Sequence, residues 1–229
     1  DVLIPGLNAA FQDVWQENKD LDLFAFSALD FEHGTNRKLP TGAYMQRRRS
    51  CSFVNGRFAL IDGLSRKNFP VCAFLYIFRR SALNKKTPLR FLNILHEDVP
   101  FTAELFLRCQ STVVSEDIFY RRRVRPNSIM TTPAGAKNVT GYMIASGWWR
   151  DTANAATVNE ARLFRREAQH FYALAMLYAG RACMPFQEVR SLVKVHIPEF
   201  LQVMRLDFAL MHLSRRLAFE FIKARSFFG

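Results

Sequence analysis

The sequence predicts a mainly α-helical protein: an irregular helical domain with long basic loops, a long C-terminal helix and room for one short β-hairpin. Between Val158 and Ala179, apolar residues recur every three or four positions, which is the spacing of an amphipathic helix. From Pro198 to about Arg225 only a narrow stripe is polar, as in a helix that is buried on most of its circumference. Thr87-Pro88 supplies a good helix start, with threonine as the N-cap and proline at the first helical position. We divide the chain into a basic, loop-rich helical region over residues 1–150 and a helical region over residues 151–229, within one continuous core.

The first third of the chain is expected to place a basic loop between helical segments. Residues 7–32 are acidic and apolar and are expected to be mostly helical, and the break at Gly34 opens a basic loop that runs through an arginine triplet. Asn55-Gly56 is the strongest local signal for a hairpin, so a short two-stranded piece is allowed within residues 51–60. The apolar segment 69–80 ends in two arginines, which suit the C-terminus of a helix.

The middle of the chain is expected to hold two further helices and a long loop. Asp98 is a candidate cap for a helix that runs toward Gln110. Ser115–Asp117 is expected to open a short helix that ends in a second arginine triplet. Residues 126–147 contain three glycines and two prolines and are predicted to form a loop. Residues 185–195 are predicted to form a short helix.

Charge is distributed unevenly along the chain, whose formal net charge is +12. Residues 34–90 carry 13 Lys and Arg against a single acid, Asp62, and residues 121–150 carry six bases and no acid. Like charges this close together repel one another and destabilise a compact state, and a bound polyanion would relieve the repulsion. The pattern therefore indicates a nucleic acid as the partner of the basic segments.

The type of base points the same way, because the chain has 24 arginines and only eight lysines. The guanidinium group grips phosphate with two parallel hydrogen bonds and stacks on bases. The codon usage of a GC-rich genome produces the same bias, but it does not explain the clustering. The residues that we expect to contact RNA are the two triplets and the bases near them: Arg47, Arg48, Arg49, Arg57, Arg66, Lys67, Arg79, Arg80, Lys85, Lys86, Arg121, Arg122, Arg123 and Arg125.

Trp148 and Trp149 follow the predicted loop and are candidate partner-binding residues. Adjacent tryptophans on a strand or loop point in opposite directions, so we expect the protein's own fold to bury at most one of them. The other would fill a partner's pocket or stack on a base, because tryptophan is enriched at binding hot spots. Ordinary packing in the core is the alternative.

The sequence contains no recognisable catalytic motif. The signatures of phosphate loops, dinucleotide folds, hydrolases and zincins are missing, and the five histidines are scattered. Glu167 and His170 have the Glu-x-x-His spacing of di-iron bundles, but that chemistry needs a second copy of the motif and two further glutamates. We therefore expect no enzymatic activity, no metal and no cofactor. In a site assembled from distant residues, His170 with Glu167 would be the best candidate.

Cysteine usage and hydropathy bear on the compartment. The four cysteines lie far apart and match no zinc pattern, so we expect free thiols in a reducing compartment. The longest strongly apolar run, Phe69 to Phe78, has ten residues, which is too short to cross a bilayer. The chain starts at Asp1 rather than Met, which the removal of an organellar presequence would explain, as would a tail that lies outside the chain.

The arginine-over-lysine bias, the clusters Arg47–Arg49 and Arg121–Arg123, the phenylalanine-rich core and the motif-free loops together give the chain a distinct character. In that character it resembles the lineage-specific ribosomal proteins of mitochondria, particularly those of kinetoplastids. The resemblance implies a structural subunit of a mitochondrial ribosome in the matrix, which clamps rRNA phosphates, packs against neighbouring subunits and has no small-molecule substrate. The alternative is a non-catalytic accessory subunit of a respiratory or ATP synthase complex, with its basic faces on acidic subunits or anionic lipid.

Overall fold

The computed structural model describes residues 1–85, 87–126, 135–202, 204–213, 219–220 and 222. The chain divides into two compact units: the first contains residues 1–91 and 101–132, and the second contains residues 92–100 and 133–229. This division does not coincide with the boundary at residue 150 that we expected, because the helix α4 (Ala136–Asn154) belongs to the second unit.

The first unit is built on a mixed sheet of six strands, so the expectation of a mainly α-helical fold with at most one hairpin is wrong. Its two long strands, β2 (Leu23–Glu32) and β6 (Thr112–Val124), are parallel neighbours. Four short strands extend the sheet, each antiparallel to one of these two. β1 (Val2–Leu3) and β4 (Cys51–Phe53) pair with β6, whereas β3 (Lys38–Leu39) and β5 (Tyr76–Phe78) pair with β2.

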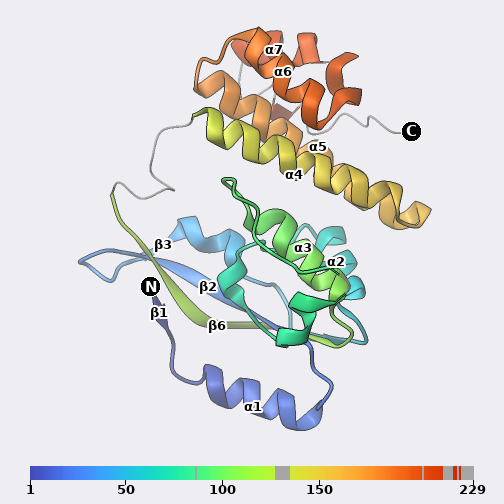
Figure 1. Cartoon of the computed structure of the whole chain (residues 1–229). Coiled ribbons are helices and arrows are strands. Elements are labelled where there is room, and N and C mark those ends of the chain that lie inside the picture. The colour runs from blue at the N-terminus through green and yellow to red at the C-terminus, as the bar shows by residue number, and fades with distance from the viewer. Residues whose placement is uncertain (86, 127–134, 203, 214–218, 221, 223–229) are drawn as a thin grey trace. The chain divides into compact units, whose positions relative to one another are not determined.

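Helices cover both faces of this sheet (Figure 1). On one face, Phe11 of α1 (Leu7–Glu17) packs on Phe24 of β2, with ring centroids 6.2 Å apart. Phe26 shares that face because side chains alternate along a strand. Figure 1 shows α2 (Gly56–Ser65) and α3 (Asp98–Arg108) on the opposite side from α1. Between the strands run the short 3₁₀ helices η1 (Pro40–Met45), η2 (Ala73–Leu75) and η3 (Arg80–Asn84).

Three segments that we expected to be helical are strands. β2 is buried on both faces along most of its length, so it reads as an almost continuous apolar run without the alternation that marks an exposed strand. Residues 69–80 do not end in a helix, because β5 pairs with the start of β2. The expected helix at Ser115–Asp117 is part of β6, which pairs with β2 on both sides of an irregularity in the register there.

Two turn signals also have other roles. Asn55-Gly56 does not form a hairpin: the Asn55 side chain accepts a hydrogen bond of 2.9 Å from the Phe58 N–H and caps α2. A Cβ at position 56 would lie 2.1 Å from the carbonyl oxygen of Phe106, so the glycine is needed for close packing. Thr87-Pro88 does not start a helix; the Thr87 carbonyl and hydroxyl oxygens accept hydrogen bonds of 2.6 and 3.3 Å from Arg108. The helix expected after Asp98 is present as α3, which begins at Asp98 itself and ends at Arg108.

The second unit is helical. The predictions for residues 158–179 and 185–195 are confirmed by α5 (Val158–Arg181) and α6 (Phe186–His196). The predicted loop over residues 126–147 is wrong from Ala136 onward, where α4 begins, and residues 127–134 lie outside the described residues. Two glycines of α4 serve packing: a Cβ at Gly141 would lie 2.1 Å from the Leu95 carbonyl oxygen, and one at Gly147 would lie 2.8 Å from that of His196.

The predicted long C-terminal helix is wrong at its start. Pro198–Gln202 forms a separate 3₁₀ helix, η4, and α7 spans Met204–Leu213. Much of the predicted helix beyond that point lies outside the described residues. The core of this unit joins α5 to its neighbours, because Trp149 of α4 packs on Phe164 at 5.5 Å and the Tyr172 hydroxyl donates to Asp207 of α7 at 2.9 Å. In the part of the chain that the structure describes, no helix is both long and apolar enough to cross a membrane.

Candidate nucleic-acid interface

The three arginines of the first triplet follow η1 and have different surroundings. Arg47 is only 6% exposed, and its Nε donates a hydrogen bond of 3.1 Å to the carbonyl oxygen of Phe26. Its guanidinium carbon lies 5.4 Å from the ring centroid of Tyr76. Arg48 is exposed, and its side chain contacts no partner among the described residues. Arg49 is half-exposed and donates to Asp62.

The backbone of the triplet is held in place by polar side chains. The Arg47 N–H donates to the Ser27 hydroxyl at 2.9 Å, and the Arg48 N–H donates to the side-chain oxygen of Asn68 at 2.9 Å. The side-chain nitrogen of Asn68 donates in turn to the carbonyl oxygen of Gln46 at 2.9 Å. The arginines therefore project from a fixed segment, which reduces the conformational freedom that they would lose on binding a ligand.

A cavity of about 280 Å³ lies against this segment. Four arginines line it, the three of the triplet and Arg66, which follows the end of α2, and its one acidic residue is Asp62. Apolar side chains complete the lining, among them those of Phe53, Phe69 and Val114. Four guanidinium groups against one carboxylate leave a formal charge of +3 at the cavity.

Asp62 holds two of these arginines. It accepts from Arg49 Nη2 at 2.7 Å and from Arg66 Nε at 2.9 Å. Burial alone would raise the pKa of Asp62, but the hydrogen bonds from Arg66 and Arg49 and their positive charges outweigh it and hold this pKa below its ordinary value. The carboxylate therefore stays charged at neutral pH and fixes the positions of two of the cations around the cavity.

The second triplet lies near the end of β6. Because side chains alternate along a strand, Arg122 points to the opposite face of the sheet from Arg121 and Arg123. Arg122 donates two hydrogen bonds of 2.8 Å to the buried carboxylate of Asp30 and one of 2.7 Å to the Tyr44 hydroxyl. Burial disfavours the charge on Arg122, but its contacts with Asp30 and Tyr44 prevail and raise its pKa above the ordinary value. Arg121 stacks over the Phe31 ring at 4.6 Å, whereas Arg123 is exposed. The middle arginine of this triplet therefore serves the fold.

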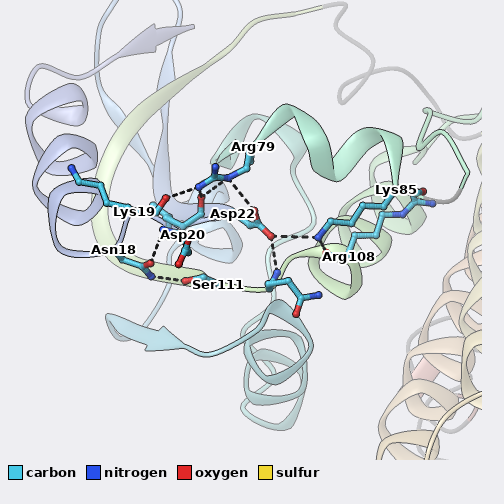
Figure 2. A network of polar contacts seen from close by, with 10 residues as sticks. Asn18, Lys19, Asp20, Asp22, Arg79, Lys85, Arg108 and Ser111 are labelled. Atoms are coloured by element: carbon cyan, nitrogen blue, oxygen red, sulfur yellow. Dashed lines mark hydrogen bonds and ion pairs between the residues drawn. The ribbon is translucent and has the colours of Figure 1, made fainter.

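Two further candidates are used inside the first unit, in the network around Asp22 that Figure 2 shows. Arg79 lies 3.2 Å from the Asp22 carboxylate and donates to the carbonyl oxygens of Lys19 and Leu21 at 2.7 and 3.1 Å. Lys85 Nζ lies 3.5 Å from the same carboxylate and donates to the carbonyl oxygen of Arg108 at 2.7 Å. These contacts join the start of β2 to the segments on either side of it, so both bases have a structural role.

The remaining candidates are mostly exposed. Within the described ranges, four of them are exposed and have no side-chain partner: Lys67, Arg80, Arg123 and Arg125. With Arg48 and Arg66 they make six exposed bases among the candidates, all in the first unit. Arg57 is half-buried, and Lys86 lies outside the described residues. Direct contact of any of these side chains with RNA stays a prediction.

The two tryptophans lie on α4 rather than on a strand or loop. Trp149 is 1% exposed and packs in the core of the second unit, whereas Trp148 is half-buried with its ring centroid 5.0 Å from that of Trp149. Trp149 is thus a core residue, and partner binding stays a prediction for Trp148.

The candidate catalytic and metal-binding residues do not gather in one cluster among the described residues. Glu167 and His170 lie on α5, where Arg166 approaches Glu167 at 3.5 Å. Among the residues that the structure describes, no three His, Cys, Asp or Glu side chains are placed to hold a metal ion. Cys72 and Cys109 are buried, Cys51 is half-buried and Cys183 is exposed, all as free thiols. The absence of enzymatic activity stays a prediction.

Sequence reasoning missed Asp62 and Asn68 as parts of the site. A signal for Asp62 was present, since the only acid among residues 34–90 has many bases to pair with. No local pattern marks Asn68, because its role depends on a contact with residues about 20 positions earlier.

Comparison of the chain with protein-family models and with curated proteins finds no match.

Proposed function

We propose that this chain is a non-catalytic RNA-binding subunit of a ribonucleoprotein, and that its first unit holds the phosphate backbone of the RNA. The observation that carries the proposal is the set of four arginines around one cavity, with a formal excess of three positive charges. Four further exposed bases of the same unit, Lys67, Arg80, Arg123 and Arg125, add to its positive charge. Such clusters bind phosphates with little regard to base sequence.

The shape of the site favours RNA over the other polyanions that we considered. A guanidinium group matches the geometry of a phosphate oxygen pair, and four of them around a hollow suit a phosphate that projects from a strand. Anionic lipid attracts lysine and arginine alike through their charge, so it would not explain why the basic residues of this chain are mostly arginines. The particle that the character of the sequence favours is a mitochondrial ribosome in the matrix. An accessory subunit of a respiratory or ATP synthase complex remains the second candidate.

A salt titration tests the proposal. If the six exposed bases each neutralise one phosphate, the affinity for single-stranded RNA falls with salt with a log–log slope of about −4. Sequence should matter little, so a mixed-sequence and a homopolymeric oligonucleotide should give the same slope. Vesicles containing anionic lipid serve as the competing ligand. Binding to the vesicles without binding to RNA at low salt would favour the membrane-associated alternative and refute the RNA-binding proposal.

A matched pair of variants makes the test specific. Arg48→Gln removes an exposed charge beside the cavity, and Arg162→Gln removes an exposed charge from α5 in the second unit. Because each lost phosphate contact changes the slope by about 0.7, Arg48→Gln should flatten it by that amount and Arg162→Gln should leave it unchanged. Equal effects of the two variants would show that net charge, rather than this surface, determines binding.

A further inference from the structure

Arg47 carries a positive charge that the described part of the protein does not neutralise. The residue is only 6% exposed, and among the described residues its guanidinium group has one acceptor, the backbone carbonyl of Phe26. No ion pair joins it to a carboxylate of the described residues, and Asp62, the one acid at the cavity, pairs with Arg49 and Arg66. Buried charges in proteins are almost always paired, since an isolated one is costly to remove from water.

Two guanidinium nitrogens beside the cavity also lack an acceptor. Arg47 Nη2 and Arg49 Nε are both shielded from solvent, and neither has a hydrogen-bond partner in the ranges that the structure describes. Bulk water cannot satisfy these donors while they are shielded. Both side chains line the same cavity, so a small shift of each guanidinium group would bring its free N–H to an acceptor placed there.

We infer that this cavity is a specific socket for one phosphate group of the RNA strand, with Arg47 and Arg49 as its inner donors and Arg48 and Arg66 at its edge. The inference rests on the proposed RNA-binding function and names the part of the surface that makes a fixed contact. A phosphate provides both the missing negative charge and several acceptor oxygens, and guanidinium groups bind it through paired hydrogen bonds.

The size and polarity of the cavity fit this ligand. At about 280 Å³ it falls just below the range of roughly 300–1,000 Å³ that is typical of sites for whole small molecules. A phosphate with part of its ribose suits that volume better than a complete nucleotide does. Asp62 would repel a phosphate that binds close to it, but it also fixes the positions of Arg49 and Arg66. The net formal charge of +3 at the cavity still attracts an anion.

The first experiment measures thermal unfolding of the whole chain in inorganic phosphate, with chloride adjusted to keep ionic strength constant. A bound anion stabilises the folded state, so the midpoint of the wild-type chain should rise with phosphate concentration. Arg49→Gln should weaken phosphate binding about tenfold or more, because a charge-assisted hydrogen bond is lost. Arg47→Lys keeps the charge but loses the paired donors and should weaken it as well. Arg162→Gln is the control and should behave like the wild type.

The second experiment repeats the RNA salt titration with the same variants. Arg49→Gln should flatten the slope by about 0.7, whereas Arg80→Gln should flatten the slope equally without changing the phosphate-dependent midpoint. If the midpoint rises equally in wild type, Arg49→Gln and Arg47→Lys, the socket assignment is overturned, and persisting RNA binding would leave the proposed function intact. A phosphate effect that the variants abolish, in a chain that binds no RNA, would overturn RNA as the source of the phosphate together with the proposed function.

Discussion

Arg122 and Asp30 lie opposite each other on the parallel strands β6 and β2, joined by two hydrogen bonds of 2.8 Å. The Asp30 side chain is completely buried, and the Thr41 hydroxyl donates a further hydrogen bond of 2.6 Å to it. One arginine of a triplet that looked like an RNA contact is therefore the counter-ion of an acid inside the fold.

We expect Arg122→Leu to destabilise the chain by about 3 to 5 kcal/mol, because it leaves a buried carboxylate without its partner. Urea unfolding followed by circular dichroism measures this. Arg123→Leu is the matched control, since that neighbour is exposed, and it should change the free energy of unfolding by less than about 0.5 kcal/mol. The double variant Asp30→Asn/Arg122→Leu should recover part of the loss. Similar stabilities for Arg122→Leu and Arg123→Leu would contradict this role for the pair.

Arg79 and Arg80 are adjacent in sequence, but substitution of Arg79 should reduce stability and substitution of Arg80 should reduce RNA binding. Arg79→Gln breaks hydrogen bonds to two backbone carbonyls and the contact with Asp22, and it should cost about 1 to 2 kcal/mol of stability, since the side chain is 38% exposed. Arg80→Gln should leave stability unchanged and flatten the RNA salt slope by about 0.7. Denaturation and RNA-binding measurements on both variants test this. An equal loss of stability in the two variants would contradict the structural role of Arg79.

The segment at His96 should give the second unit a pH-dependent stability with two opposing contributions. Burial lowers the pKa of His96 to about 4, and burial, with the charge of Glu97, raises the pKa of Asp98 to about 6. The His96 contribution is fully present above the unfolded-state pKa of 6.5 and is lost as the pH falls from there toward 4. The Asp98 contribution is fully present below the unfolded-state value of 3.8 and is lost as the pH rises toward 6.

Single variants should separate the two. Between pH 4 and pH 6, Asp98→Asn should become more stable as the pH rises relative to the wild type, and His96→Gln should become less stable, as urea midpoints at several pH values would show. Parallel pH profiles for wild type and both variants would mean that neither group is perturbed in the folded state.

Gly141 should tolerate no side chain. A Cβ there would lie 2.1 Å from a backbone carbonyl oxygen, whereas a Cβ at Gly135 of the same region meets nothing within 4 Å. Gly141→Ala should therefore cost about 3 kcal/mol through overpacking, against about 1 kcal/mol or less for Gly135→Ala at the start of α4. Thermal midpoints of the two variants measure the difference, and equal midpoints would show that α4 is free to shift.

The helices α5 and α6 were predictable because their apolar residues keep helical spacing over their whole length. β2 was not, because it is buried on both faces and shows no alternation, and the pairing of β2 with β6 depends on residues far away in sequence. Dependence on distant residues also limited the prediction of the candidate site. The arginine clusters are visible in the sequence, but only the strand geometry of β6 distinguishes Arg122 from Arg123, and only the fold places Asp62 among the arginines.

The parallel pairing of β2 and β6 has a consequence for how the chain matures. β2 is complete at residue 32, but its central partner begins at residue 112, so a chain that grows from its N-terminus leaves that edge of β2 unpaired while residues 33–111 are made. Non-local pairing of this kind slows folding, and an unpaired strand edge invites aggregation. Premature termination before Thr112 would therefore release an aggregation-prone fragment that carries the first arginine triplet but lacks β6, the strand that joins β1, β2 and β4. The first unit becomes a folding unit only when the second triplet has been made.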